Sequence, residues 1–552
     1  MGGERQDTTG SPRAGASGRR PAWIVGAASL ALVGIGAGAW AVFGGRDEPR
    51  TGPLSAAEVR SAADGFLDAW AEGDTDGAAR RTSDAASAGA ALRAYRDRAH
   101  LVPKRLTPGA AQGTRVPVGV GAEFAYDGAR APLTYDTALT VVRRAGDGEP
   151  VVRWEPSVPH PQLTAGKRLE TRETGAAPLR AADRSGRALD TETFPSLKPV
   201  VEGLRRSYGK TAGGRPGLEL RVVPDGRASS DAAPPAGKVL LTVPEGAPGR
   251  LRTTLDARVQ AAAEREVARR TDASLVVLKP STGEILAVAN SRTGGPNIAL
   301  EGRLAPGSTM KMITASLLLE KHIADPDKPH PCPKTASYGG WQFHNVDDFD
   351  IAGGTFRTSF AASCNTAFIT QAGKLADDAL ARQAREVFGI GEHWSVGVDA
   401  FDGAVPVEHA ASKAASMIGQ GEVRMNPLTM ASVVSTARTG TFRQPYLVAP
   451  SIGHRTLATA SRTLDPAAHR QLRDLLHTTA TAGSAAGSMA GLTGDIGAKT
   501  GSAEVIGQKE PNGWFAAWHG DLAAAAVMQR GGRGGESSGP LVAAVLKAVP
   551  SE

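Results

Sequence analysis

The sequence predicts a multidomain α+β protein with one N-terminal transmembrane helix and a larger C-terminal domain built on a five-stranded antiparallel sheet flanked by helices. Three observations predict this architecture: an uncharged apolar stretch near the N-terminus, a region where helices precede strands, and a long C-terminal region that begins and ends with strands. The chain has 552 residues, and several units are expected because domains usually contain roughly 100–200 residues.

Residues 22–44 form the apolar stretch and predict a transmembrane helix. They carry no charge, and at about 1.5 Å per residue the helix would extend about 35 Å, enough for a hydrocarbon core of about 30 Å. Arg13, Arg19 and Arg20 lie just before the stretch. By the positive-inside rule, residues 1–21 form a cytoplasmic tail and the chain after residue 45 lies outside. A cleaved signal peptide is the alternative, but its apolar core would usually have only about 7–15 residues.

Charge and cysteine content narrow the classes of function. Lys+Arg total 63 and Asp+Glu total 56, and these charges are interspersed along the chain without a basic stripe. This pattern argues against nucleic acid as a partner. The two cysteines are too few for a disulfide framework, and no His/Cys cluster has the spacing of metal ligands. The sequence therefore predicts neither a metal site nor a cofactor.

Two smaller units are expected before the C-terminal domain. In residues 52–162, apolar positions at helical spacing come first, and segments with strand-like alternation follow. Helices followed by strands predict a small α+β domain. Residues 163–250 are rich in Arg, Gly, Pro and Asp and contain short strand candidates, so we expect a small pedestal domain that links the larger units.

Residues 251–552 show the most regular pattern. The expected elements are a helix at 254–270, a hairpin of strands at 274–278 and 285–289, strands at 496–506, 513–518 and 522–529, and a helix at 540–549. Two strands first, helices between them and three strands last predict the five-stranded antiparallel sheet.

The first candidate for chemistry is Ser308-Thr309-Met310-Lys311, which begins an apolar helical stretch. On a helix, a three-residue offset places Ser308 Oγ and Lys311 Nζ on one face. A lysine removes a serine proton only when it is neutral, and burial favours that form. The pattern alone is a weak signal, because Ser207-Tyr208-Gly209-Lys210 has the same spacing in a polar segment and is interpreted as a chance match.

Two further motifs follow in order. Ser363-Cys364-Asn365 is the only Ser-x-Asn in the chain, and Lys499-Thr500-Gly501 is the only Lys-Thr-Gly and falls within a strand candidate. Ser-x-x-Lys, Ser-x-Asn and Lys-Thr-Gly in this order are the signature of penicillin-binding proteins and related β-lactamases. The joint pattern is therefore a strong signal.

Further stretches resemble class B penicillin-binding proteins over roughly residues 254–549. Gly419-Gln420-Gly421 with the following Pro-Leu-Thr-Met-Ala at 427–431 is similar to their GQG…TPLQMA stretch, and Gly513-Trp514-Phe515 is similar to the AWF that follows their Lys-Thr-Gly. Residues 154–161 resemble the exit of their NTF2-like N-terminal domain. The resemblance implies a penicilloyl-serine transferase fold behind an NTF2-like domain.

The resemblance also implies residue roles. Ser308 would be the acylated nucleophile and Lys311 its general base. Ser363 would relay a proton to the leaving amine, and Asn365 would hold an amide side chain of the substrate. Lys499, as a neighbouring cation, would favour the neutral form of Lys311.

Substrate-binding roles follow in the same way. Lys499 and Thr500 would bind the terminal carboxylate of a D-Ala-D-Ala stem peptide, and Gly501 would let that backbone approach closely. The backbone N–H groups of Ser308 and Ser502 would form the oxyanion hole.

The implied function is a peptidoglycan D,D-transpeptidase of the cell membrane, with a catalytic domain outside the membrane and β-lactams as inhibitors. Since no glycosyltransferase domain precedes the transpeptidase, a glycan-polymerising membrane partner is expected. A D,D-carboxypeptidase or a β-lactamase of the same fold is the alternative, although no motif supplies a deacylating base. A β-lactam sensor would need a larger cytoplasmic part, and an inactive scaffold would be expected to lack a motif residue.

The two cysteines leave two interpretations open. Cys332 and Cys364 both fall in the part expected outside the cell, where a disulfide can persist. A bridge would fix the loop that presents Ser363 and Asn365. Alternatively, Cys364 is a small buried spacer and Cys332 a loop thiol.

Overall fold

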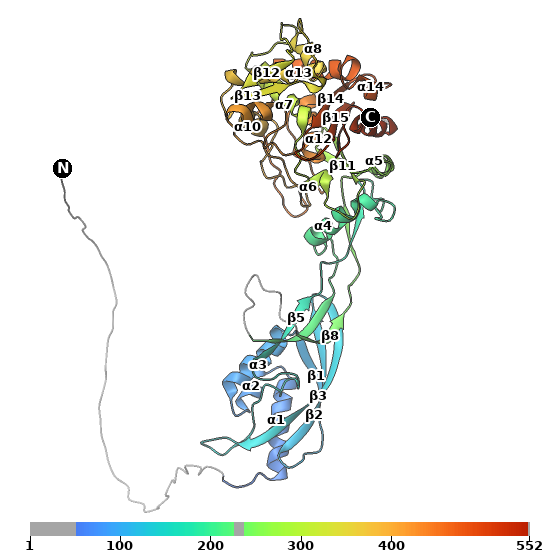
Figure 1. Cartoon of the computed structure of the whole chain (residues 1–552). Coiled ribbons are helices and arrows are strands. Elements are labelled where there is room, and N and C mark those ends of the chain that lie inside the picture. Colours follow the sequence, from blue (N-terminus) through green and yellow to red (C-terminus); the bar gives the residue numbers. More distant parts are fainter. Residues whose placement is uncertain (1–50, 226–236, 550–552) are drawn as a thin grey trace, which may run out of the picture. The chain divides into compact units, whose positions relative to one another are not determined.

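The structure is a computed structural model that describes residues 51–225 and 237–549, which fold into several sheets with helices packed on them (Figure 1). This agrees with the predicted multidomain α+β organisation. Within these two ranges, no helix is long and apolar enough to cross a membrane. The transmembrane helix predicted at residues 22–44 lies outside the described residues.

The N-terminal unit packs three helices against a four-stranded sheet in the order β1-β2-β3-β4. Its elements are α1 Ala56–Ala71, α2 Thr75–Arg80, α3 Ala85–Asp97, β1 Leu101–Pro108, β2 Arg115–Tyr126, β3 Ala129–Arg143 and β4 Pro150–Val152. Helix α1 begins in a capping box, in which Ser55 and Glu58 each bond the other's backbone N–H. Buried Phe66, Trp70 and Tyr95 form part of its core.

The connecting region has two small sheets, one 3₁₀ helix and one α-helix. A three-stranded sheet runs in the order β5-β7-β8, and β6 pairs in parallel with β9. The bounds are β5 Lys167–Glu173, β6 Leu179–Ala182, η1 Pro195–Leu197, α4 Lys198–Tyr208, β7 Leu218–Pro224, β8 Lys238–Val243 and β9 Gly249–Arg252.

The C-terminal domain is built on a five-stranded antiparallel sheet in the order β11-β10-β16-β15-β14 (Figure 1). Its strands are β10 Ala273–Lys279, β11 Glu284–Asn290, β14 Ile496–Ala503, β15 Asn512–His519 and β16 Leu522–Met528, with a separate hairpin of β12 Thr335–Tyr338 and β13 Trp341–His344. The predicted five-stranded antiparallel sheet is thus confirmed. Strand β14 ends at Ala503, earlier than predicted, because the chain turns after Val505 and leaves Ile506 fully exposed.

Helices cover both faces of this sheet. The helices of this domain are α5 Ala257–Val267, α6 Ile298–Glu301, η2 Gly307–Met310, α7 Lys311–Glu320, η3 Val346–Asp348, α8 Phe356–Ala361, α9 Thr366–Ile369, η4 Ala372–Lys374, α10 Ala379–Glu386, α11 Ala410–Met417, α12 Pro427–Thr439, α13 Pro466–Ala482, α14 Ala486–Met489 and α15 Ser538–Ala548. Alternate residues of β10 serve the two sides: Leu275 and Val277 belong to the core with α5 and α15, whereas Val276 and Leu278 belong to the core with α7 and α12.

Strand β10 joins the two ends of the domain's sequence. It pairs with β11, the next strand along the chain, and with β16, where Ala273 lies opposite Met528. The region between these strands carries α7, whose residues 311–319 are all buried. A helix that is buried on every side is a core element, so its N-terminus is held firmly against the sheet.

Candidate active site

Ser308 and Lys311 meet at the junction of η2 and α7. The Ser308 Oγ and Lys311 Nζ atoms are 2.9 Å apart. The first turn is a 3₁₀ turn, whereas the sequence predicted one continuous helix from Ser308. Because a 3₁₀ turn has about three residues per turn, residues three apart are nearly eclipsed, which brings the two side chains together. Ser308 is half-buried and Lys311 is fully buried.

The Lys311 amine has two further partners on the Ser-x-Asn loop. Its Nζ donates to the Ser363 carbonyl oxygen and to Asn365 Oδ1, each at 2.7 Å. Burial, and then the charge of Lys499, holds the pKa of Lys311 well below its usual value. A neutral amine has two N–H groups and one lone pair. With both N–H groups used by the loop, the lone pair is left for the Ser308 hydroxyl.

Ser363 connects this amine to a second lysine. The Lys499 Nζ donates to Ser363 Oγ at 2.8 Å and to the Thr500 carbonyl oxygen at 3.0 Å. Lys499 is fully buried, and burial lowers its pKa to about 7. Ser363 has a φ of 62°, a left-handed conformation that costs on the order of 1–3 kcal/mol for a residue other than glycine. Such strain is typical of functional loops.

The Lys-Thr-Gly motif lies on β14, the edge strand of the sheet. In its register with β15, Lys499 lies opposite Ala516 and Gly501 opposite Trp514. A Cβ at Gly501 would approach the Pro306 carbonyl oxygen to 2.9 Å, so only glycine lets β14 pack this closely against η2. Ser502, half-buried, also borders η2, since its carbonyl oxygen would lie 2.6 Å from a Cβ at Gly307.

The structure thus brings Ser308, Lys311, Ser363, Asn365 and Lys499 into one chain of contacts, with Thr500, Gly501 and Ser502 beside it. The Ser207–Lys210 copy has a different setting. Lys210 is exposed and pairs with Glu173. Among the described residues, no three His, Cys, Asp or Glu side chains lie where they could hold a metal ion.

Two functional residues were not found from the sequence. The fully buried side chain of Asn345 accepts from the backbone N–H of Asn365 at 2.8 Å and of Thr366 at 3.1 Å, and so fixes the Ser-x-Asn loop. Ser484 Oγ lies 2.8 Å from Thr500 Oγ1. Neither residue belongs to a motif with a chemical signature, so no sequence signal separates them from other loop residues.

Cys332 and Cys364 form a disulfide in this structure. The bridge joins the middle residue of the Ser-x-Asn motif to the segment that leads into the β12–β13 hairpin. Asn345 Nδ2 lies 3.2 Å from Cys332 Sγ, so the bridge and the amide hold the same loop. Of the two interpretations left open by the sequence, the structure therefore favours the bridge.

Replacing both cysteines by serine, or reducing the bridge, is expected to lower the free energy of unfolding by about 3–4 kcal/mol for a loop of 32 residues. We also expect slower acylation by a β-lactam, because the loop presenting Ser363 and Asn365 loses a constraint. Melting temperature and acylation rate measured with and without reductant check this. The double-serine variant is the control, since reductant should not affect it; equal rates in reduced and oxidised protein would contradict the link to the site.

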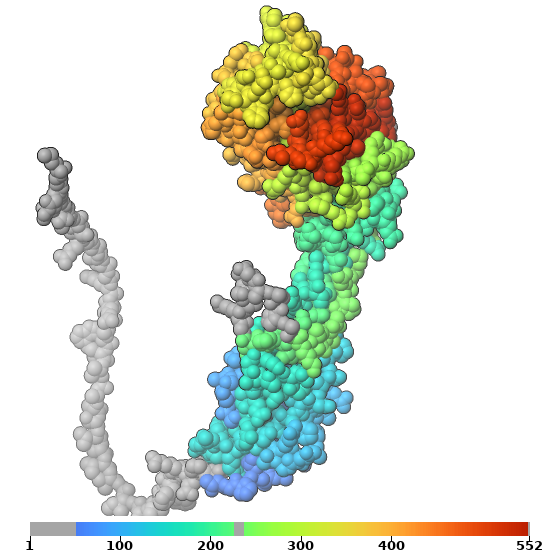
Figure 2. Space-filling view, viewed as in Figure 1, coloured from blue at the N-terminus to red at the C-terminus, as the bar shows by residue number. Residues whose placement is uncertain are grey.

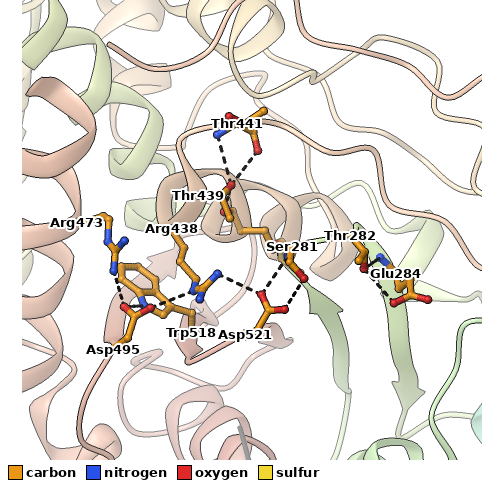
Figure 3. Close-up of polar contacts among 12 residues, drawn as sticks. Ser281, Thr282, Glu284, Arg438, Thr439, Thr441, Arg473, Asp495, Trp518 and Asp521 are labelled. Atoms are coloured by element: carbon orange, nitrogen blue, oxygen red, sulfur yellow. Dashed lines mark hydrogen bonds and ion pairs between the residues drawn. The ribbon is translucent and has the colours of Figure 1, made fainter. Parts of the chain in front are cut away.

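A charged network holds Asp495, which directly precedes β14 and lies four residues before Lys499 (Figure 3). Arg438, near the end of α12, lies between Asp495 and Asp521, at 3.3 and 3.2 Å. Asp495 also accepts from Arg473 on α13 and from the Trp518 indole N–H. The side chain of Asp521 accepts from Ser281 in the β10–β11 turn. This network connects α12, α13, the β10–β11 turn and the β15–β16 turn to the start of β14, the strand that carries Lys499.

Comparisons with known proteins agree with this geometry. A profile of the penicillin binding protein transpeptidase domain matches residues 273–547. The peptidoglycan D,D-transpeptidase PbpA of Mycolicibacterium smegmatis is 27% identical over 370 residues, which make up 55% of this chain and 73% of that protein. The PbpA of Mycobacterium tuberculosis is also 27% identical, over 364 residues, 54% of this chain and 72% of that protein.

Solved structures show the same fold. A chain of a peptidoglycan synthase complex that coordinates polymerization and crosslinking is 20% identical, with a TM-score of 0.54 over 70% of this chain and 92% of that chain. Penicillin binding protein 3 of Mycobacterium tuberculosis is 20% identical, with a TM-score of 0.52 over 68% of this chain and 96% of that chain. The protein is thus a homologue of PbpA and of class B penicillin-binding proteins, and its residues 273–547 belong to the penicillin binding protein transpeptidase family.

Proposed function

We propose that this protein is a serine-type peptidoglycan D,D-transpeptidase. The observation that carries the proposal is the contact of the buried Lys311 amine with Ser308 Oγ, in a site where burial lowers the pKa of Lys311 and the Ser-x-Asn loop accepts two further hydrogen bonds from Nζ. This arrangement prepares a serine for attack on an amide carbonyl. The family membership and the relatives named as D,D-transpeptidases support the same reaction class.

The reaction has two acyl-transfer steps. Ser308 Oγ attacks the carbonyl between the last two D-Ala residues while Lys311 takes the hydroxyl proton. The leaving D-Ala amine receives a proton through Ser363, which the Lys499 ammonium contacts. An amine of a neighbouring stem peptide then attacks the ester, and the proton that this amine loses passes to Ser308 Oγ, which leaves as the free hydroxyl. The N–H groups of Ser308 and Ser502 stabilise the oxyanion in both steps.

Binding roles complete the proposal. Thr500, fixed by Ser484, takes the terminal carboxylate, and Asn365 takes an amide of the stem peptide. A β-lactam mimics the D-Ala-D-Ala end and stops after the first step.

We further propose the cellular setting. The predicted order is a tail at 1–21, a membrane helix at 22–44, an NTF2-like domain at 52–162, a pedestal at 163–250 and the transpeptidase domain at 251–552. The bias of arginines before residue 22 supports a cytoplasmic N-terminus and a catalytic domain outside the cell membrane. The NTF2-like domain acts as a spacer or docking module. A glycan-polymerising membrane protein is the proposed partner, in line with the synthase complex that has a similar chain.

An acyl-transfer assay tests the reaction. Full-length protein in detergent is given a D-Ala-D-Ala stem peptide and an amine acceptor, and mass spectrometry counts the joined and the hydrolysed products. We expect the joined product to dominate. Hydrolysed product alone, with a normal acyl-enzyme, would instead indicate the alternative, a D,D-carboxypeptidase.

A further inference from the structure

An ion pair joins two segments that border the active site from opposite sides. Arg533, in the loop between β16 and α15, pairs with Asp347, in the turn after β13. The residues are 186 positions apart in sequence. In Figure 2, yellow residues of the middle of the sequence border red residues of the C-terminal part on the viewed face. Both side chains are exposed, 53% for Arg533 and 64% for Asp347, so water and ligands reach them.

The backbone of Arg533 is fixed beside the Lys-Thr-Gly motif. Glycines flank it on both sides, at positions 531–532 and 534–535. A Cβ at Gly534 would lie 2.3 Å from the Gly501 carbonyl oxygen, and a Cβ at Gly535 would lie 3.5 Å from Thr500 Cγ2. The loop therefore lies directly against β14, and the side chain of Arg533 projects from it to Asp347.

Asp347 is fixed beside the Ser-x-Asn loop. It comes two residues after Asn345, which bonds the backbone N–H of Asn365. Asp347 and Asp348 both have left-handed φ values, 58° and 53°, in a strained turn. Asp348 lies near Lys334 and His344, at 3.9 and 3.4 Å, so within this turn Asp347 supplies the carboxylate that meets Arg533.

The two sides of the site are thus joined twice. The first connection is the hydrogen bond from the buried Lys499 to Ser363 Oγ, and the second is the exposed ion pair of Arg533 and Asp347. An exposed ion pair contributes little to stability, so stability alone does not account for a strained turn placed here. Lys499, which is fully buried and bonded to two oxygens, is poorly placed to meet a carboxylate directly. Arg533 is permanently charged and exposed, and it directly precedes the glycines that lie beside Thr500 and Gly501.

We propose that Arg533 is a specificity-determining residue that pairs with a carboxylate of the acyl donor, and that Asp347 occupies its guanidinium while the site is empty. Guanidinium and carboxylate match in a bidentate geometry, so a substrate carboxylate can replace that of Asp347 without loss of hydrogen bonds. The inference deepens the proposed function and rests on it. It makes Asp347 an internal competitor of the substrate.

Opposite effects of two substitutions test the inference. The rate of acylation by benzylpenicillin, which carries a carboxylate, is compared with that of its methyl ester. Arg533→Gln is expected to slow the acid about tenfold and to leave the ester nearly unchanged. Asp347→Asn is expected to speed the acid severalfold, because the competing anion is removed. Arg93→Gln and Asp76→Asn break an exposed pair in the N-terminal unit and should change neither rate.

Changes of the same sign in Arg533→Gln and Asp347→Asn, or none in either, would overturn the inference. A second readout needs no chemistry: binding of a D-Ala-D-Ala peptide to Ser308→Ala protein should weaken with Arg533→Gln and tighten with Asp347→Asn. If the proposed function is wrong, wild-type protein will form no adduct at Ser308. The peptide titration still tests in that case whether Arg533 binds the carboxylate of the ligand.

Discussion

Ser308→Ala is expected to abolish covalent capture of β-lactams while the protein stays folded. Lys311 Nζ bonds three oxygens, and only that of Ser308 belongs to a hydroxyl. The Ser308 side chain is half-buried and lies just before the buried helix α7. Truncation to alanine removes one oxygen and leaves the core contacts of α7 intact. Intact-mass spectrometry after incubation with a penicillin measures the adduct, and peptide mapping locates it.

The control is Ser207→Ala, which removes the serine of the chance Ser-x-x-Lys match and should leave labelling unchanged. Labelling that survives Ser308→Ala, or that maps to Ser207, would show that another nucleophile carries the chemistry. Circular dichroism and the melting temperature verify that both variants are folded.

Lys311→Ala is expected to slow acylation of Ser308 by about 10²–10⁴-fold, the usual contribution of a positioned general base. The amine contacts the hydroxyl directly, and burial, together with the nearby charge of Lys499, lowers the pKa of Lys311, which favours the unprotonated form that a base requires. Stopped-flow or fluorescent-penicillin kinetics measure the rate. Near-normal labelling of a folded variant would mean that another group takes the proton.

The pH profile separates this role from a structural one. As the pH falls, Lys311 takes up a proton and can no longer act as base, so wild-type acylation should decline toward acid pH. In Lys311→Ala this decline should disappear along with the rate. The matched control is Lys210→Ala, in which an exposed, ion-paired lysine is lost and neither the rate nor the profile should change.

The sequence predicted the parts of the fold and site that depend on local pattern. The hairpin of β10 and β11, strands β15 and β16, and the order of the three motifs all follow from residues close together in the chain. The spacing of Ser308 and Lys311 also predicted their contact, although the turn is 3₁₀. Here the Gly307 backbone, with φ of 54° and fixed between Ser502 and Gly419, decides the geometry.

The remaining parts depend on contacts between distant segments. Asn345 acts on Asn365 only because the β12–β13 hairpin returns to the Ser-x-Asn loop, and Arg533 meets Asp347 across 186 positions. Neither residue type, nor its neighbours, carries a pattern that points to the partner. The strain at Ser363 is similarly invisible in sequence, since a serine at positive φ is held there by its surroundings.

The pairing of β10 with β16 sets an order of events during synthesis. Lys499 is synthesised 191 positions after Ser308 (499 − 308). The sheet is complete only when β16 pairs with β10, where Met528 lies opposite Ala273. Contacts between such distant segments form late and slowly in folding. A nascent or truncated chain that stops before β14 therefore contains the nucleophile without the second lysine or the strand that receives substrate. We therefore expect a chain that stops before β14 to form no adduct with a β-lactam.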